Sequence, residues 1–121
     1  MDDCLSELYS YRSGAAGNKD YGYWFGGHNN YSIIERVDYS NDSATTTTKG
    51  PMTANRYATA AVGNQSFGYV GGSGLVGTTV IDRLDYSNDT ATALARGNTG
   101  TNGGYKGAVG NASFGYFAGG Y

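Results

Sequence analysis

Four aspartates in two matching pairs are the residues of this chain best suited to chemistry. Asp38 and Asp42 bracket the run Asp-Tyr-Ser-Asn-Asp, and Asp85 and Asp89 bracket a second copy of it. Paired carboxylates can serve as acid and base in hydrolysis, and the oxygen-rich run offers ligands for Ca²⁺. An EF-hand loop would need a Gly at its sixth position and a Glu at its twelfth, and both are missing.

A catalytic site needs one asymmetric set of groups, whereas these acids occur once per copy with the same neighbours. The pattern therefore favours turn capping, and we expect no catalytic residue and no enzymatic activity. Residues two apart lie on the same face of a strand. Arg36 with Asp38, and Arg83 with Asp85, are thus predicted to link adjacent strands by charge-assisted hydrogen bonds.

Histidine and cysteine supply no metal chemistry here. His28 is the sole histidine and Cys4 the sole cysteine, which excludes an intrachain disulfide and every cysteine-based zinc pattern. The run Gly71-Gly-Ser-Gly74 lacks the lysine and the following helix that a phosphate-binding loop requires. We expect neither a metal site nor a cofactor.

The elements that position these residues are set by a tandem repeat. The run Arg36-Val-Asp-Tyr-Ser-Asn-Asp42 returns 47 residues later as Arg83-Leu-Asp-Tyr-Ser-Asn-Asp89. A run ending in a double glycine occupies 64–72 and returns at 111–120, with a looser copy at 18–27. A period of roughly 40–50 residues, with short alternating segments between Gly-rich turns, is typical of propeller blades. Residues shared between copies are predicted to build the blade: Arg36, Asp38, Tyr39, Asp42, Arg83, Asp85, Tyr86, Asp89, Gly71, Gly72, Gly119 and Gly120.

The middle copy predicts how one repeat forms four antiparallel strands. Strand a covers 56–62, strand b 66–70, strand c 79–86 and strand d 91–95, with a turn at Gly63 and Asn64. Along strand c, alternation places Ile81, Arg83 and Asp85 on one face and Val80, Asp82, Leu84 and Tyr86 on the other. The double glycine is predicted to adopt positive φ or to allow a close backbone approach.

Composition agrees with an all-β fold. Gly accounts for 21 of 121 residues, and Gly, Thr and Asn are poor helix formers. The net charge of −2, with basic residues scattered, gives no reason to expect nucleic acid as a partner. Neither a bilayer-spanning apolar stretch nor a signal peptide is present. We therefore expect synthesis in the cytoplasm and no membrane insertion.

The repeat resembles the kelch repeat. Pro51-Met-Thr-Ala-Asn-Arg56 is similar to the entry of a kelch inner strand, Tyr69-Val-Gly-Gly72 to the double-Gly strand, and Asp85-Tyr86 to an inverted Tyr-Asp pair. The fourth strand lacks the tryptophan of kelch blades, and the only one is Trp24. Ser87-Asn-Asp-Thr-Ala-Thr92 also faintly resembles the Asp-box turn of sialidase propellers. The combination is most similar to kelch-like repeats of phage and giant-virus structural proteins, which implies a virion component such as a tail fibre.

Counting strands gives about two and a half blades per chain. We expect an N-terminal segment at 1–11, blade 1 at 12–47, blade 2 at 48–95 and a half blade of strands a and b at 96–121. A propeller closes with about 4 to 8 blades, and an open one leaves bare strand edges. The chain is therefore predicted to form a homo-oligomer or filament, to complete another propeller, or to be part of a longer polypeptide.

Positions that differ between copies are free to bind a ligand. The loop after the first double glycine differs most, which predicts a glycan or protein site at Trp24, His28, Asn29, Asn30 and Tyr31. His28 and the aromatic residues also have ordinary structural explanations. Two functions follow: a non-enzymatic recognition or structural module of a virion or extracellular surface, or a self-assembling ring or filament without a small ligand.

Overall fold

The computed structural model describes residues 14–26, 32–56, 58–73, 79–100 and 106–119. These ranges contain ten strands in three antiparallel sheets and no α-helix, so the all-β prediction is confirmed. No helix within them is long and apolar enough to cross a membrane. The predicted N-terminal segment at 1–11 lies outside the described residues.

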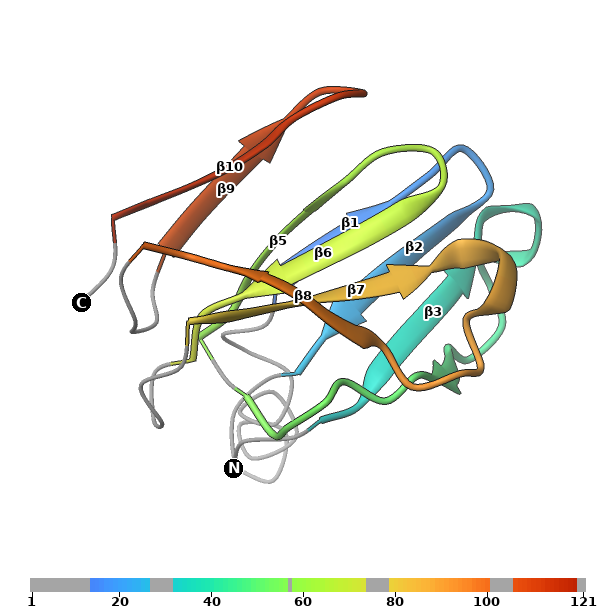
Figure 1. Cartoon of the computed structure of the whole chain (residues 1–121). Coiled ribbons are helices and arrows are strands. Elements are labelled where there is room, and N and C mark those ends of the chain that lie inside the picture. The colour runs from blue at the N-terminus through green and yellow to red at the C-terminus, as the bar shows by residue number, and fades with distance from the viewer. Residues whose placement is uncertain (1–13, 27–31, 57, 74–78, 101–105, 120–121) are drawn as a thin grey trace, which may run out of the picture.

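Each of the first two sheets has four strands in chain order, and the third is a hairpin (Figure 1). The first sheet contains β1 (Gly14–Gly17), β2 (Tyr21–Phe25), β3 (Ile34–Asp38) and β4 (Thr47–Lys49). The second sheet contains β5 (Ala60–Gly63), β6 (Phe67–Gly71), β7 (Val80–Asp85) and β8 (Leu94–Asn98). The hairpin pairs β9 (Lys106–Gly110) with β10 (Gly115–Gly119).

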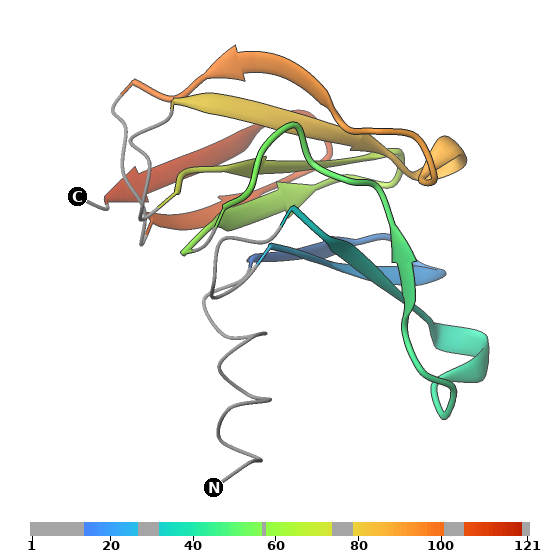
Figure 2. The same ribbon diagram turned by 90° about the horizontal axis from the view of Figure 1, so that it is seen from below.

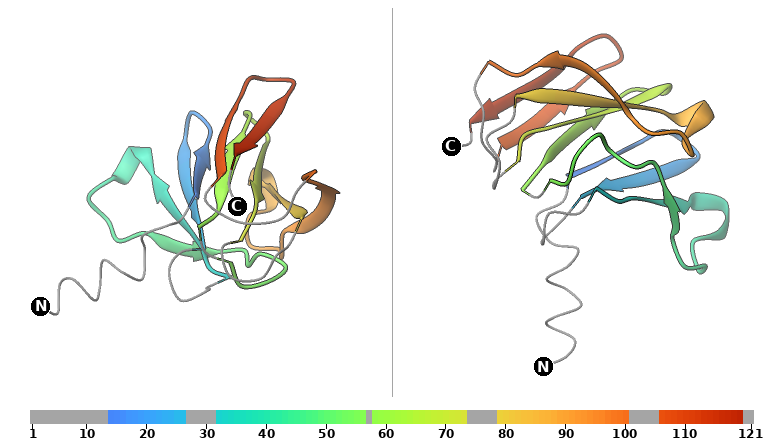
Figure 3. Two further views of the ribbon diagram at one scale, coloured as in Figure 1. Left: turned by 90° about the vertical axis from the view of Figure 1, so that its left-hand side faces the viewer. Right: turned by 60° about the horizontal axis from the view of Figure 1, so that its bottom comes forward.

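The three sheets stand side by side, with their first strands adjacent. β5 contacts β1 on one side and β9 on the other, so the second sheet lies between the first sheet and the hairpin (Figure 3). No closed ring of sheets is present among the described residues. The repeat therefore produces a row of similar sheets, and no other described sheet covers the outer face at either end of the row.

An asparagine shapes the tight turn between the first two strands of every copy. The side-chain oxygen of Asn64 accepts hydrogen bonds of 2.9 Å from the backbone amides of Ser66 and Phe67. Asn18 and Asn111 make the matching pair of bonds in the other copies. Asn side chains commonly bond to backbone two residues on. The bonds made by Asn64 confirm the predicted turn there.

An aspartate caps the turn that follows the third strand. Asp38 and Asp85 each accept a 2.9 Å hydrogen bond from the backbone amide two residues on, and each begins a one-turn 3₁₀ helix, η1 (Tyr39–Asn41) or η2 (Tyr86–Asn88). Figure 2 shows η1 and η2 on the same side of the molecule. Because this turn uses several residues, β8 begins at Leu94 rather than at the predicted residue 91, and the predicted boundaries at 47 and 95 fall inside β4 and β8.

One glycine per copy ends the second strand in the left-handed region. Gly26, Gly72 and Gly119 have φ values of 71°, 82° and 73°. The prediction of positive φ is therefore confirmed for Gly72 and Gly119, while Gly71 is an ordinary strand residue and Gly120 lies outside the described residues. The structure aligns Gly72 with Gly26, one position away from the alignment suggested by the glycine pairs.

The core lies between the first and second sheets. Phe25, Ile34, Val70 and Leu84 are at most 1% exposed, and they pack with Met52 and with the stacked rings of Tyr23 and Tyr86. The predicted alternation along β7 is confirmed, because Asp82 and Leu84 are buried while Ile81 and Arg83 are half-buried. Apolar burial of this kind is the main source of stability for such a small domain.

Glycines in the first two strands make room for the tyrosine of the third strand. A Cβ placed on Gly63 would lie 2.6 Å from the hydroxyl oxygen of Tyr86 and 2.5 Å from the carbonyl oxygen of Phe67. Gly68 faces the same ring, and Gly22 faces Tyr39 in the same way in the first sheet. The repeated glycines are therefore a packing requirement of the repeated tyrosines.

Replacing Gly63 by alanine is expected to lower the free energy of unfolding by about 2 kcal/mol, because overpacking forces backbone or ring shifts. Gly107→Ala is the matched control, since a Cβ there meets nothing within 4 Å among the described residues. Urea unfolding followed by circular dichroism measures both. Equal stabilities for the two variants would contradict this account of the glycine.

Candidate binding interface

Asp89 joins the first and second sheets through contacts with the side chains of Tyr23, Arg36 and Lys49. We call these four residues the latch. The hydroxyl of Tyr23 donates a 2.7 Å hydrogen bond to Asp89 Oδ2, and Arg36 Nη1 donates one of 2.9 Å to the same oxygen. Lys49 Nζ lies 3.5 Å from Asp89 Oδ1. Strands β2, β3 and β4 thus each contribute one donor to an acid from the second sheet.

The latch is largely shielded from solvent. The side chain of Asp89 is 8% exposed and that of Arg36 is 21% exposed. Burial and the neighbouring Asp89 carboxylate raise the pKa of Tyr23 far above its usual range, so this tyrosine stays protonated as a donor. Burial alone would lower the pKa of Arg36, but the hydrogen bond and charge of Asp89 outweigh it and the pKa is raised. Tyr23 and Arg36 are therefore both held as protonated donors to Asp89.

Backbone bonds run beside the latch. The amide of Gly50 donates to the carbonyl of Asp89 at 2.8 Å, and the amide of Ala93 donates to the carbonyl of Pro51 at 2.7 Å. The segment between β4 and β5 therefore also binds the turn that carries Asp89.

Arg36 with Asp38, and Arg83 with Asp85, were predicted to link adjacent strands by charge-assisted hydrogen bonds, and no such link within one sheet is present among the described residues. Asp38 and Asp85 turn toward the serine hydroxyls and amides of their own 3₁₀ turns, which lowers the pKa of both aspartates. Arg36 instead reaches across to Asp89. The prediction was wrong because the cap satisfies the nearer acid locally and leaves the arginine to a distant one.

The second sheet carries a copy of the latch donors on the face that is turned away from the first sheet: Tyr69, Arg83 and Arg96, with Phe67 beneath. We call these four residues the open socket. These residues match Tyr23, Arg36, Lys49 and Tyr21 in the repeat. Arg83 lies 4.3 Å from the centre of the Phe67 ring, as Arg36 lies 4.2 Å from that of Tyr21. The rings of Phe67 and Tyr69 are 6.4 Å apart, the same distance as those of Tyr21 and Tyr23. Phe67, Tyr69 and Arg83 are therefore arranged like their counterparts in the latch.

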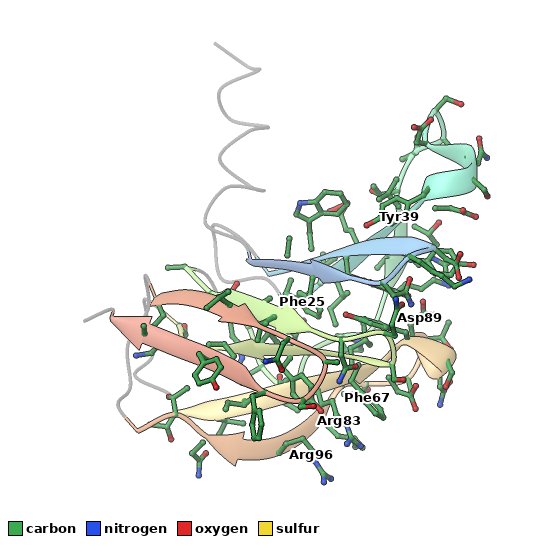
Figure 4. All side chains as sticks on the ribbon, turned by 90° about the horizontal axis from the view of Figure 1, so that it is seen from above. Phe25, Tyr39, Phe67, Arg83, Asp89 and Arg96 are labelled. Carbon is green, nitrogen blue, oxygen red and sulfur yellow. The ribbon has the colours of Figure 1, made fainter. Side chains whose placement is uncertain are left out.

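No acid fills this socket among the described residues. Neither Arg83 nor Arg96 forms an ion pair with any residue in those ranges. Figure 4 shows Phe67, Arg83 and Arg96 on the side of the second sheet that faces away from the first, whereas Asp89 lies between the two sheets. The donors of the second sheet are thus in position without their acceptor.

A cavity of about 220 Å³ opens beside the socket, between the second sheet and the hairpin. Tyr69 and Ile81 line it from one side, and Phe114, Gly115 and Phe117 from the other. At the filled junction, Tyr86 stacks on Tyr23 at 4.8 Å and packs against Gly68. Because Tyr69 and Gly115 are the repeat counterparts of Tyr23 and Gly68, the cavity corresponds to the space that Tyr86 occupies.

Large apolar side chains are exposed on both end faces of the row. Trp24 and Tyr39 of the first sheet are 42% and 50% exposed, and Val109 and Tyr116 of the hairpin are 69% and 58% exposed. Figure 4 shows Tyr39 on the side of the first sheet turned away from the second. Exposed apolar surface gathered in this way marks interaction sites.

Of the five residues predicted to bind a glycan or protein, Trp24 alone lies within the described ranges, and His28, Asn29, Asn30 and Tyr31 lie outside them. Trp24 is next to the end of β2 that leads to the predicted loop, whereas the cavity lies at the opposite, Asn64 end of the strands. The sequence analysis missed Tyr23, Lys49 and their counterparts Tyr69 and Arg96. Their matching repeat positions were the available signal.

A second buried ion pair joins β7 to the segment that leads into β5. Arg56 Nη2 is 3.4 Å from Asp82 Oδ2, and their side chains are 1% and 0% exposed. Thr53 donates to Asp82 from its amide at 2.9 Å, and from its hydroxyl. Burial lowers the pKa of Arg56, and the charge of Asp82 opposes this. The pair fixes the segment that leads into β5.

Four aspartates of the described residues are thus engaged in caps or ion pairs: Asp38, Asp82, Asp85 and Asp89. No group of three histidine, cysteine or acidic side chains in those ranges could hold a metal ion. No protein-family model and no curated protein matches this chain.

Proposed function

We propose that this chain is a non-enzymatic, kelch-like structural repeat module whose sheets are propeller-type blades. In this proposal its end faces associate with further copies, forming a ring or filament such as part of a phage or virus fibre. The observation that carries the proposal is that repeat positions which are buried between the first two sheets are exposed at the end faces. Trp24 is 42% exposed, whereas its repeat counterpart Val70 is fully buried.

The use of the polar residues supports a role in construction. Asp38 and Asp85 cap turns, Asp82 neutralises Arg56, and Asp89 joins two sheets. These are structural tasks, and they recur because each repeat must be built in the same way. A catalytic centre would instead need one constellation that differs from its repeats.

Glycan recognition is the weaker of the two functions. An exposed tryptophan is suited to stacking on a sugar ring. Yet the exposure of Trp24 is what the repeat predicts for any end face, because the matching face of the second sheet is covered by the first. Apolar residues of an end face therefore fit a neighbouring sheet without a sugar being required.

Sedimentation velocity tests the proposal across a range of protein concentrations. We expect a mass above the 12.7 kDa of one chain, rising with concentration. A ring is expected to give a narrow distribution of masses and a filament a broad one. Trp24→Ser and Tyr116→Ser, one on each end face, are each expected to weaken association about tenfold or more, as central aromatic residues do at interfaces.

Lys19→Ser is the control, because the side chain of Lys19 is 78% exposed in the turn between β1 and β2 rather than on an end face. It is expected to leave association unchanged. A folded wild-type chain that stays at 12.7 kDa over the whole concentration range would overturn the proposal.

A further inference from the structure

The junction between the first and second sheets shows what occupies a site of this kind. There the segment 84–89 supplies Leu84 to the core, the Tyr86 ring to Tyr23 and Gly68, and the Asp89 carboxylate to the latch donors. The strand that carries these groups, β7, is paired antiparallel with β6. A third strand and the turn after it therefore fill the junction.

The junction between the second sheet and the hairpin has the same receiving parts. Tyr69 and Arg83 face each other across β6 and β7, as Tyr23 and Arg36 do across β2 and β3. Gly110 and Gly115 match the glycines that pack against Tyr86. Among the described residues, β10 pairs with β9 alone, so its other edge is available to a strand.

We propose that this edge of β10, together with the open socket, binds a β-hairpin with the chemistry of the chain's own segment 80–98. The incoming strand pairs antiparallel with β10 and places its tyrosine in the cavity beside Tyr69. The aspartate three residues later accepts hydrogen bonds from Tyr69 and Arg83 and pairs with Arg96. The partner is thus another repeat of this type, and this inference rests on the proposed function because it names the partner of one end of the module.

Charge and shape both select this occupant. Two arginines and a tyrosine hydroxyl can all donate hydrogen bonds, which suits a carboxylate because it is an acceptor. The Phe67 ring holds Arg83 in place before any ligand arrives. A small free anion would satisfy the donors but leave the cavity and the strand edge empty. A strand that adds to an exposed sheet edge gains affinity from backbone bonds and specificity from alternate side chains.

A fluorescent synthetic peptide of residues 80–98 tests the inference by anisotropy with the whole chain. We expect saturable binding, weakened about tenfold or more by Asp89→Asn in the peptide and by Arg83→Gln in the protein, because hydrogen bonds between charged groups are lost. Arg96→Gln, at an exposed position, is expected to weaken binding as well and serves if Arg83→Gln fails to fold by circular dichroism.

Lys19→Gln is the charge-matched control and is expected to leave peptide affinity unchanged, because Lys19 lies in the exposed turn between β1 and β2. Hydrogen exchange locates the peptide: amides of β10 are expected to gain protection. Absence of binding, binding indifferent to Asp89→Asn, or protection confined to the first sheet would each overturn the inference.

The two proposals fail separately. If the peptide does not bind but the chain still associates through Trp24 and Tyr116, the module stands and the hairpin site is wrong. If the peptide binds at β10 while the chain alone remains at 12.7 kDa, the hairpin site stands and self-association is wrong.

Discussion

Replacement of Asp82 by alanine is expected to lower the free energy of unfolding by about 3–5 kcal/mol, the range measured when one partner of a buried ion pair is removed. The variant leaves the guanidinium of Arg56, 1% exposed, without its counter-charge. It also leaves the amide and hydroxyl of Thr53 without their acceptor. Urea unfolding followed by circular dichroism measures the loss.

Glu35 is the matched control, since it occupies the same repeat position in the first sheet. It is only half-buried and accepts one described hydrogen bond, of 2.7 Å, from Thr46. Glu35→Ala is expected to cost about 1 kcal/mol, the usual value for a single hydrogen bond. Replacing both members of the buried pair, as Arg56→Met with Asp82→Leu, is expected to recover much of the stability. Equal losses for Asp82→Ala and Glu35→Ala would contradict the assignment.

Replacement of Asp89 by alanine is expected to lower the free energy of unfolding by about 3 kcal/mol, because Arg36, Lys49 and Tyr23 lose a common acceptor inside the molecule. The loss separates the first and second sheets rather than unravelling either one. Thermal unfolding should show it as a fall in Tm of about 10–20 °C for a domain of this size.

Asp42→Ala is the control, and the comparison is sharp because both aspartates end the same five-residue run. Asp42 is exposed and makes no ion pair with any described residue. In dilute protein its removal is expected to change stability by no more than about 0.5 kcal/mol. A loss as large as that of Asp89→Ala would show that the latch does not hold the sheets together.

The fold was predictable wherever the signal is local. Asn64 bonds to the amides two and three residues on, and Asp85 caps the turn that it begins, so each turn is specified by its own few residues. Alternation placed Leu84 and Ile81 on opposite faces of one strand for the same reason. The start of β8 was predicted too early, because the length of the capped turn cannot be read from strand propensity alone.

The candidate site was less predictable, because its members come from different sheets. Tyr23 and Asp89 are 66 residues apart in the chain and 2.7 Å apart between their oxygens. Arg36 was paired with the nearest acid in sequence, whereas its partner is set by how two sheets pack. Repeat positions identified which residues matter without saying which copies meet.

The sequence by itself determined the period, the turns and the strand faces, because these depend on residues a few positions apart or on strands joined by short turns. Tertiary structure alone decided that Asp89 is a buried acceptor while Asp42, at the same place in an identical run, is exposed. The two runs have the same local chemistry, and the difference arises because the face that carries Asp89 has a neighbouring sheet to supply donors. The face that carries Asp42 has no such neighbour among the described residues.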